Sequence, residues 1–269
     1  MSKLSLSRAW EESRAILAHD GRLLASVALA LVVLPETIAG LIAPTSTGEG
    51  SGMTLALLAI TILIGFIAQI ALNRLAIGPS TTVGAAIGRG VTRMPALLGA
   101  FILLMVGIFI LLIPIVLAFS ALGLVQSPGV GNEAPPSLLL LIVLLAALCY
   151  AIFQLTIPVS AAEQGGPIHL LKRSWHLSRG AYFALLAFVI LVFVCLTIVL
   201  VAGQVAFGSM IVALLGSPTP LSLSALIISL VLAVLQAIFT VIFAVMVARI
   251  YLQLAERTDP QPSVPRSGT

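Results

Sequence analysis

Charged side chains are scarce in this chain of 269 residues, since Asp, Glu, Lys and Arg together make up only 8% of it. A typical soluble domain carries about 25% charged residues. So few charges cannot cover a globular surface, and the composition therefore excludes a water-soluble protein. Intrinsic disorder is excluded as well, because disordered chains combine high charge with low hydrophobicity, whereas 60% of these residues are hydrophobic. The composition predicts an integral membrane protein.

Cysteine is equally scarce: Cys149 and Cys195 are the only two, and each lies inside a long apolar run. Two such thiols form neither a disulfide framework nor a tetrahedral metal site. The nucleotide-binding loops, the His-Glu-x-x-His motif and the Gly-x-Ser-x-Gly motif are missing. His169 and His176 could share a helix face, but no third metal ligand is near them in sequence. We therefore expect no enzymatic activity, no metal and no cofactor.

Long apolar runs are abundant. A helix needs about 20 apolar residues to cross a hydrocarbon core of about 30 Å. Backbone groups in lipid must bond internally, so each run of this length should form a helix. Six runs qualify, at residues 23–43, 53–75, 95–124, 137–159, 181–200 and 221–248. We predict an all-α polytopic membrane protein whose single domain spans residues 1–257, followed by a disordered cytoplasmic tail at 258–269. The first run begins only at Leu23 and exceeds a signal-peptide core, so we expect it to be retained.

The distribution of Lys and Arg predicts the orientation. If the links alternate sides, all 13 basic residues fall at or beyond one set of helix ends, and the three opposite links contain none. Basic residues are retained on the cytoplasmic side of a membrane. Both termini are therefore expected in the cytoplasm. This asymmetry also accounts for the net charge of +4 without a nucleic-acid partner.

The chain shows weak self-similarity at a period of about 85 residues. Each copy consists of a span, a basic link and a span, and Gln69 and Arg89 of the first copy correspond to Gln154 and Arg173 of the second. Because both copies begin outside, the duplication is predicted to be parallel. We expect each basic link to hold an amphipathic helix on the cytoplasmic membrane surface, and the N-terminal segment around Trp10 to form a third, less regular one.

The basic side chains of these links are candidate contacts for lipid head groups. In the second link, Ile168, Leu171 and Trp175 form an apolar stripe beside a basic side. The simpler interpretation is topology plus nonspecific attraction to anionic lipid; the sharper one is a specific phospholipid or glycerophosphate site. The candidate residues are Lys172, Arg173, His176, Arg179, Arg89 and Arg93.

Four polar residues lie inside the apolar runs. Glu36 lies about 20 Å from the inner end of its helix, which places it in the outer third of the core. An intramembrane acid can mark a transport pathway, but one this close to an interface, behind Pro35, can also be structural. Gln69, Gln154 and Gln236 are expected in one layer near the cytoplasmic side, away from Glu36, where amides usually bond helices together.

Two stretches carry a resemblance to a known family: SLSRAWEESRAILAHDGRLL, and above all AAEQGGPIHLLKRSWHLSRGAYF. With the duplicated arrangement, they resemble the membrane domain found with bacterial glycerophosphoryl diester phosphodiesterases. In fused members of that family, hydrolysis belongs to a separate soluble domain, which this chain lacks. The resemblance implies a stand-alone module in a bacterial plasma membrane, linked to lipid or envelope metabolism.

Two functions are thus expected. The first is a non-enzymatic module that binds membrane lipids through anionic head groups, or binds a membrane-protein partner. The alternative is a small transporter or channel component that uses Glu36. A polar, water-accessible cavity reaching Glu36 would favour transport, whereas a closed apolar bundle with a basic cytoplasmic rim would favour the module.

Overall fold

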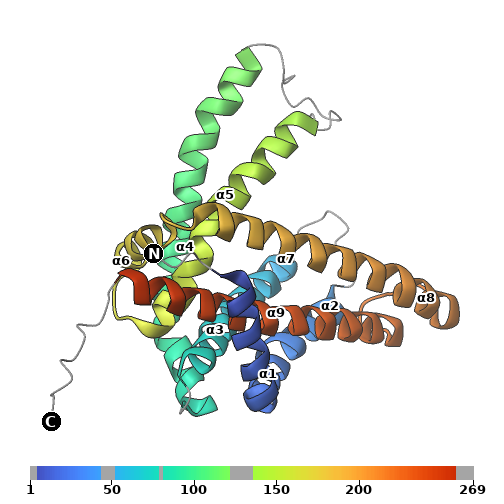
Figure 1. Ribbon diagram of the computed structural model, residues 1–269. Coiled ribbons are helices and arrows are strands. Elements are labelled where there is room, and N and C mark those ends of the chain that lie inside the picture. Colours follow the sequence, from blue (N-terminus) through green and yellow to red (C-terminus); the bar gives the residue numbers. More distant parts are fainter. Residues whose placement is uncertain (1–4, 44–51, 79–80, 122–135, 259–269) are drawn as a thin grey trace, which may run out of the picture.

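The computed structural model describes residues 5–43, 52–78, 81–121 and 136–258. Within these ranges the chain forms helices and no strand (Figure 1). The elements are α1 (Leu6–Ala28), the π-helical segment η1 (Leu29–Val33), α2 (Leu34–Ile42), α3 (Gly52–Ile77), α4 (Val83–Ala121), α5 (Pro136–Ala162), α6 (Pro167–Ser178), α7 (Tyr182–Gly203), the π-helical segment η2 (Gln204–Gly208), α8 (Ser209–Leu215) and α9 (Leu223–Thr258).

Six helical stretches are long and apolar enough to cross a membrane, and each contains or overlaps one predicted run. They are Leu6–Ile42, Gly52–Ile77, Val83–Ala121, Ile142–Ala162, Tyr182–Leu215 and Leu223–Thr258. For the described residues the predicted all-helical class is therefore confirmed, and six helices are long and apolar enough to be the predicted spans. The end of the third predicted run and nearly all of the predicted tail lie outside those residues.

Two segments predicted to be separate surface helices are continuous with spans, which corrects the prediction. Residues 83–94 form the first part of α4, and the N-terminal segment forms the first part of α1. Ala86, Gly90 and Leu97 are buried on α4, which packs against α3. Helix α3 therefore covers the side of this stretch that carries Ala86 and Gly90, whereas Val91 is 52% exposed. The two predicted copies also differ, since α6 ends before α7 begins whereas the corresponding part of α4 runs on.

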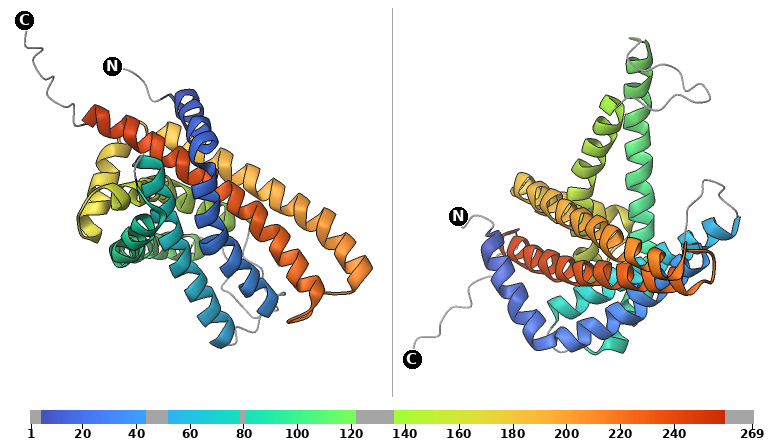
Figure 2. Two further views of the ribbon diagram at one scale, coloured as in Figure 1. Left: turned by 90° about the horizontal axis from the view of Figure 1, so that it is seen from below. Right: turned by 90° about the vertical axis from the view of Figure 1, so that its right-hand side faces the viewer.

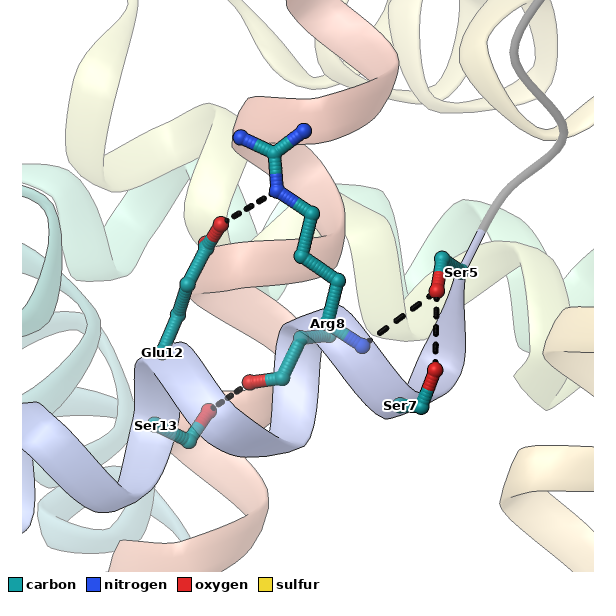
Figure 3. Close-up of polar contacts among 6 residues, drawn as sticks. Ser5, Ser7, Arg8, Glu12 and Ser13 are labelled. Carbon is teal, nitrogen blue, oxygen red and sulfur yellow. Dashed lines mark hydrogen bonds and ion pairs between the residues drawn. The ribbon is translucent and has the colours of Figure 1, made fainter.

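The N-terminal end of α1 is closed by local hydrogen bonds (Figure 3). The Ser5 hydroxyl accepts from the backbone N–H of Arg8 at 3.3 Å, which caps the helix. Arg8 forms an exposed ion pair with Glu12 at 2.7 Å, one helical turn away. Ser13 is fully buried and donates to the carbonyl of Ala9. Ala9 is buried in a cluster with residues of α9, so this end of α1 packs against α9.

Both interruptions in long helices follow from the sequence. Pro35 has no N–H to donate, and the preceding turn adopts π-helical bonding, in which Leu34 N–H donates to the carbonyl of Leu29. A second π-helical segment directly follows Gly203.

The helices gather at one end of the molecule and diverge at the other. Figure 1 and the left view of Figure 2 place α6, the start of α1 and the end of α9 at the same end, which we call the basic end. Leu155, Leu170 and Ile250 form a buried core there, from α5, α6 and α9. The far halves of α4 and α5 project away from the other helices (Figure 1). Phe109 and Ile110 of α4 are 62% and 67% exposed, as expected of side chains that face lipid.

Candidate functional site

Arginine side chains at the basic end bind the carbonyl ends of neighbouring helices. Arg89 of α4 donates to the carbonyls of Ala161 at 3.3 Å, Ala162 at 3.5 Å and Glu163 at 3.2 Å, where α5 ends. Arg93, one turn later, donates to the carbonyl of Gly165 at 3.4 Å. The last carbonyls of a helix have no partner within it, and a cation near them is favourable. The placement of Arg89 and Arg93 therefore favours a structural role, and their predicted contact with head groups stays a prediction.

Arg249 of α9 acts in the same way on a different helix. Its guanidinium donates to the carbonyl of Ala76 at 3.3 Å, near the end of α3. The sequence analysis counted Arg249 only toward the charge asymmetry. Its position directly after the predicted end of its span, at residue 248, was the available signal for such a role.

Glu163 connects three helices and was missed by the sequence analysis. Its carboxylate accepts from Arg173 Nε of α6 at 3.1 Å and from the Tyr251 hydroxyl of α9 at 3.1 Å. The Arg173 and Glu163 side chains are 21% and 25% exposed, so this ion pair is partly shielded from solvent. The sequence did offer a signal for this ion pair, because Glu163 is the one acid in a link rich in basic residues. Arg173, a predicted head-group contact, is therefore committed to a carboxylate of the protein.

Helix α6 has one buried and one exposed face. Leu170, Ser174 and Leu177 are buried, and the Ser174 hydroxyl donates to the carbonyl of Ile152 in α5 at 2.5 Å. These contacts fix which way the helix faces.

The exposed face of α6, which we call the outer face, combines basic and apolar side chains. It consists of Ile168, Lys172, Trp175, His176 and Arg179, whose spacing places them along one side of a helix. Ile168 and Trp175 are 61% and 53% exposed. The side chains of Lys172, His176 and Arg179 form no hydrogen bond or ion pair within the described part of the chain. Three of the predicted head-group residues thus remain available to a ligand.

Glu36 of α2 is in contact with Gln236 of α9, whose Nε2 lies 3.4 Å from the Glu36 carboxylate. The predicted separation between Glu36 and the glutamine layer is therefore wrong for Gln236. Depth was counted from the ends of the apolar runs, but α9 extends to Thr258 and the first span starts at Leu6. Depths counted from the helix ends cannot be compared between helices that are longer than the hydrocarbon core and tilt to different extents.

A cavity of about 250 Å³ surrounds this contact. Its polar lining residues are Glu36, Gln69, Gln236, Thr240, Tyr150 and Thr61. Gln69 Oε1 is buried and has no hydrogen-bond partner among the described residues. The structure thus brings together three of the four predicted intramembrane polar residues. Tyr150 and Thr240 were missed, since a lone hydroxyl in an apolar run gives no signal of a shared site.

Gln154 lies elsewhere. It is fully buried in α5, and its amide nitrogen donates to the carbonyl of Ala151 at 3.2 Å within the same helix. Its Oε1 has no partner among the described residues, and it does not line the cavity. The predicted bond from this amide to another helix is not seen in the described contacts.

An apolar cavity of about 370 Å³ adjoins the polar one. Leu31, Pro35 and Thr61 line both cavities, so the two share a boundary formed by the π-helical segment, α2 and α3. The remaining lining of the larger cavity is almost entirely aliphatic and reaches Ile87 and Val91 of α4. The two together resemble a site for a molecule with a polar and an apolar part.

Over the described residues, these features define an all-helical protein with six helices able to span a membrane, a basic end where arginines bind helix-end carbonyls, and a partly open cavity with one carboxylate. The chain belongs to the family described as Domain of unknown function (DUF7847), whose model matches residues 5–254. No curated protein and no solved structure matches the chain.

Proposed function

We propose that the protein is a non-enzymatic integral membrane module that binds anionic lipid head groups through the outer face of α6. The plasma membrane is the proposed location, with the basic end and both termini in the cytoplasm. The observation that carries this proposal is the outer face itself, where Lys172, His176 and Arg179 are exposed beside Ile168 and Trp175.

A helix with this composition is suited to the head-group layer of a membrane. The basic groups attract anionic lipid at about 1 kcal/mol each, while an exposed Trp favours the interface between head groups and acyl chains. Because Leu170 and Leu177 hold the opposite face in the protein core, α6 presents this side outward. Its position next to the start of α7 is consistent with the inner boundary of a span.

The link to glycerophospholipid or envelope metabolism rests on the sequence resemblance to the phosphodiesterase-associated membrane domain. In the same proposal, α3–α4 and α5–α7 are parallel copies of one unit, of which only the second keeps its basic link as a separate surface helix. The competing hypothesis is that the outer face binds a membrane-protein partner, and the test of the proposal distinguishes protein binding from lipid binding.

The proposal is tested by purifying the full chain in native lipid and analysing the retained lipids and proteins by mass spectrometry. The variant Lys172→Gln with Arg179→Gln removes two charges from the outer face. Arg14→Gln with Arg257→Gln removes two exposed charges elsewhere and serves as the matched control. We expect the first variant to lose anionic lipid and the control to keep it. Equal lipid retention in both, or the loss of a co-purifying protein instead, contradicts lipid binding by this face.

The Glu36 cavity favours a second candidate function, the transport of a small molecule or ion. Transport requires a polar group that a substrate can reach within the membrane, and the carboxylate and amides converge there. Flux into proteoliposomes is expected to disappear in Glu36→Gln and to persist in Glu256→Gln, which changes an exposed acid at the basic end. A flux that is unchanged in Glu36→Gln excludes this candidate.

A further inference from the structure

The cavity around Glu36 contains hydrogen-bond acceptors that the protein itself leaves incompletely used. The carboxylate has one described hydrogen bond, the 3.4 Å contact from Gln236, which is long for a charged acceptor. Gln69 Oε1 is buried without a partner among the described residues. Carrying both groups within the membrane core costs free energy. A ligand that supplies positive charge or N–H donors would recover part of that cost.

Aromatic rings form another part of the same lining. Phe66, Phe101 and Phe153 all line the cavity, and they form a continuous edge-to-face series with ring centroids 5.6 and 5.7 Å apart. Tyr150 adds a fourth aromatic side chain. Aromatic faces attract cations, and they recognise alkylated ammonium groups that cannot donate hydrogen bonds.

The adjoining cavity accounts for the rest of the ligand. It is larger, at about 370 Å³ against about 250 Å³, and its lining is almost wholly aliphatic. Its boundary with the polar cavity lies at Leu31 and Pro35, which are five residues and one residue before Glu36. The aliphatic cavity is open on one side, where Leu34, Ile60 and Val91 are each more than half exposed, so an alkyl chain can enter it.

We propose that the two cavities form one binding site for an amphiphilic organic cation. Glu36 provides the counter-charge to an ammonium group, the phenylalanine series surrounds that group, and the aliphatic cavity holds its alkyl chain. This inference shares Glu36 with the transport candidate above, but it concerns binding and is measured without flux. Saturable binding with no flux would uphold this site and exclude transport, whereas flux of an inorganic cation without such binding would do the opposite.

The test measures binding of radiolabelled hexyltrimethylammonium to the full chain in nanodiscs of zwitterionic lipid, with hexanesulfonate as a competitor of opposite charge. We expect saturable binding that hexanesulfonate does not displace. Glu36→Gln should weaken binding by about tenfold or more, because it removes the counter-charge and keeps the side-chain shape. Glu256→Gln should bind as the unchanged protein does.

A second variant addresses the cavity without changing any charge. Gly65 lines the polar cavity, and a Cβ built there meets no atom within 4 Å. Gly65→Leu should therefore fill the cavity and abolish binding while the protein still folds. Gly107→Leu is the matched control, since Gly107 lies on the exposed outer part of α4 and also has open space around it.

Two results would overturn the proposal. One is binding of the ammonium probe that Gly65→Leu leaves unchanged. The other is displacement by hexanesulfonate as effective as by unlabelled probe, which would mean that the site recognises the alkyl chain alone.

Discussion

Arg89 offers the sharpest test of whether the basic end is held together by its own cations. Its guanidinium donates to three carbonyls at the end of α5 and so joins α4 to that helix end. Arg89→Gln removes the charge and the forked donor geometry and keeps most of the aliphatic stem. If the interactions stabilise the fold, this variant must unfold more easily.

The expected magnitude follows from the geometry. Hydrogen bonds to a charged group contribute about 1.5–3 kcal/mol when they are well formed, and a cation at a helix C-terminus contributes up to about 2 kcal/mol when partly buried. The three donor–acceptor distances, 3.2, 3.3 and 3.5 Å, are long. We therefore expect a loss of about 2 kcal/mol, which corresponds to a fall in Tm of about 4–8 °C for a chain of this size.

The assay is a thermal melt in detergent followed by tryptophan fluorescence, since Trp175 lies on α6 at the basic end. Arg14→Gln, on the exposed side of α1, controls for the loss of one positive charge. The Tm of Arg89→Lys should lie between those of Arg89→Gln and the unchanged protein, because lysine keeps the charge but lacks the several N–H donors of the guanidinium. A Tm for Arg89→Gln within about 1 °C of the Arg14→Gln control would refute the capping argument. Lost lipid selectivity at unchanged Tm would instead restore the head-group role.

The remaining predictions concern packing and topology. Gly90→Ala should destabilise the folded protein by about 1–3 kcal/mol, because the new Cβ would lie 2.8 Å from the backbone carbonyl oxygen of Ile67. Gly88→Ala, which has open space two residues earlier, is the control and should be neutral or slightly stabilising. Equal Tm values for the two variants would contradict the close approach of α3 and α4. Tyr251→Phe should lower the free energy of unfolding by about 0.5–1.5 kcal/mol, because it removes the hydrogen bond to Glu163. In a double-mutant cycle with Glu163→Gln the two losses should not add, and strict additivity would mean that the two side chains are not coupled. Labels added outside intact cells should reach neither terminus, and modification of either one would reverse the assigned orientation.

The sequence predicts the spans well because their cause is local. Any run of about 20 apolar residues must become a helix in lipid, whatever its neighbours are. The ends of the helices are harder, since they depend on packing. Residues 83–94 have the period of a surface helix, yet Ala86 and Gly90 are buried and the helix continues into the span. Periodicity reveals that one face is apolar, but it does not reveal whether lipid or another helix covers that face.

The cavity illustrates a different limit. Gln69, Glu36 and Gln236 could be found as polar residues in apolar runs, but their convergence depends on how three helices cross and tilt. A depth estimate from helical rise assumes that every span starts at the same boundary and runs straight. The first span violates both conditions, because it starts within the polar N-terminal segment and contains the π-helical segment before Pro35.

The arginines show why a charge count gives topology more reliably than it gives a binding site. All 13 basic residues contribute to the inside–outside asymmetry irrespective of what each side chain contacts. Head-group binding, in contrast, needs donors that the protein does not already use. Arg89 and Arg249 donate to carbonyls at or near helix ends, Arg93 donates to the carbonyl of Gly165 in the link after α5, and Arg173 pairs with Glu163. These helix ends collect at the basic end, and the carbonyls that have no partner within their own helix attract cations there. The residues that remain for lipid are therefore the ones whose helix face points away from every helix end, as on the outer face of α6.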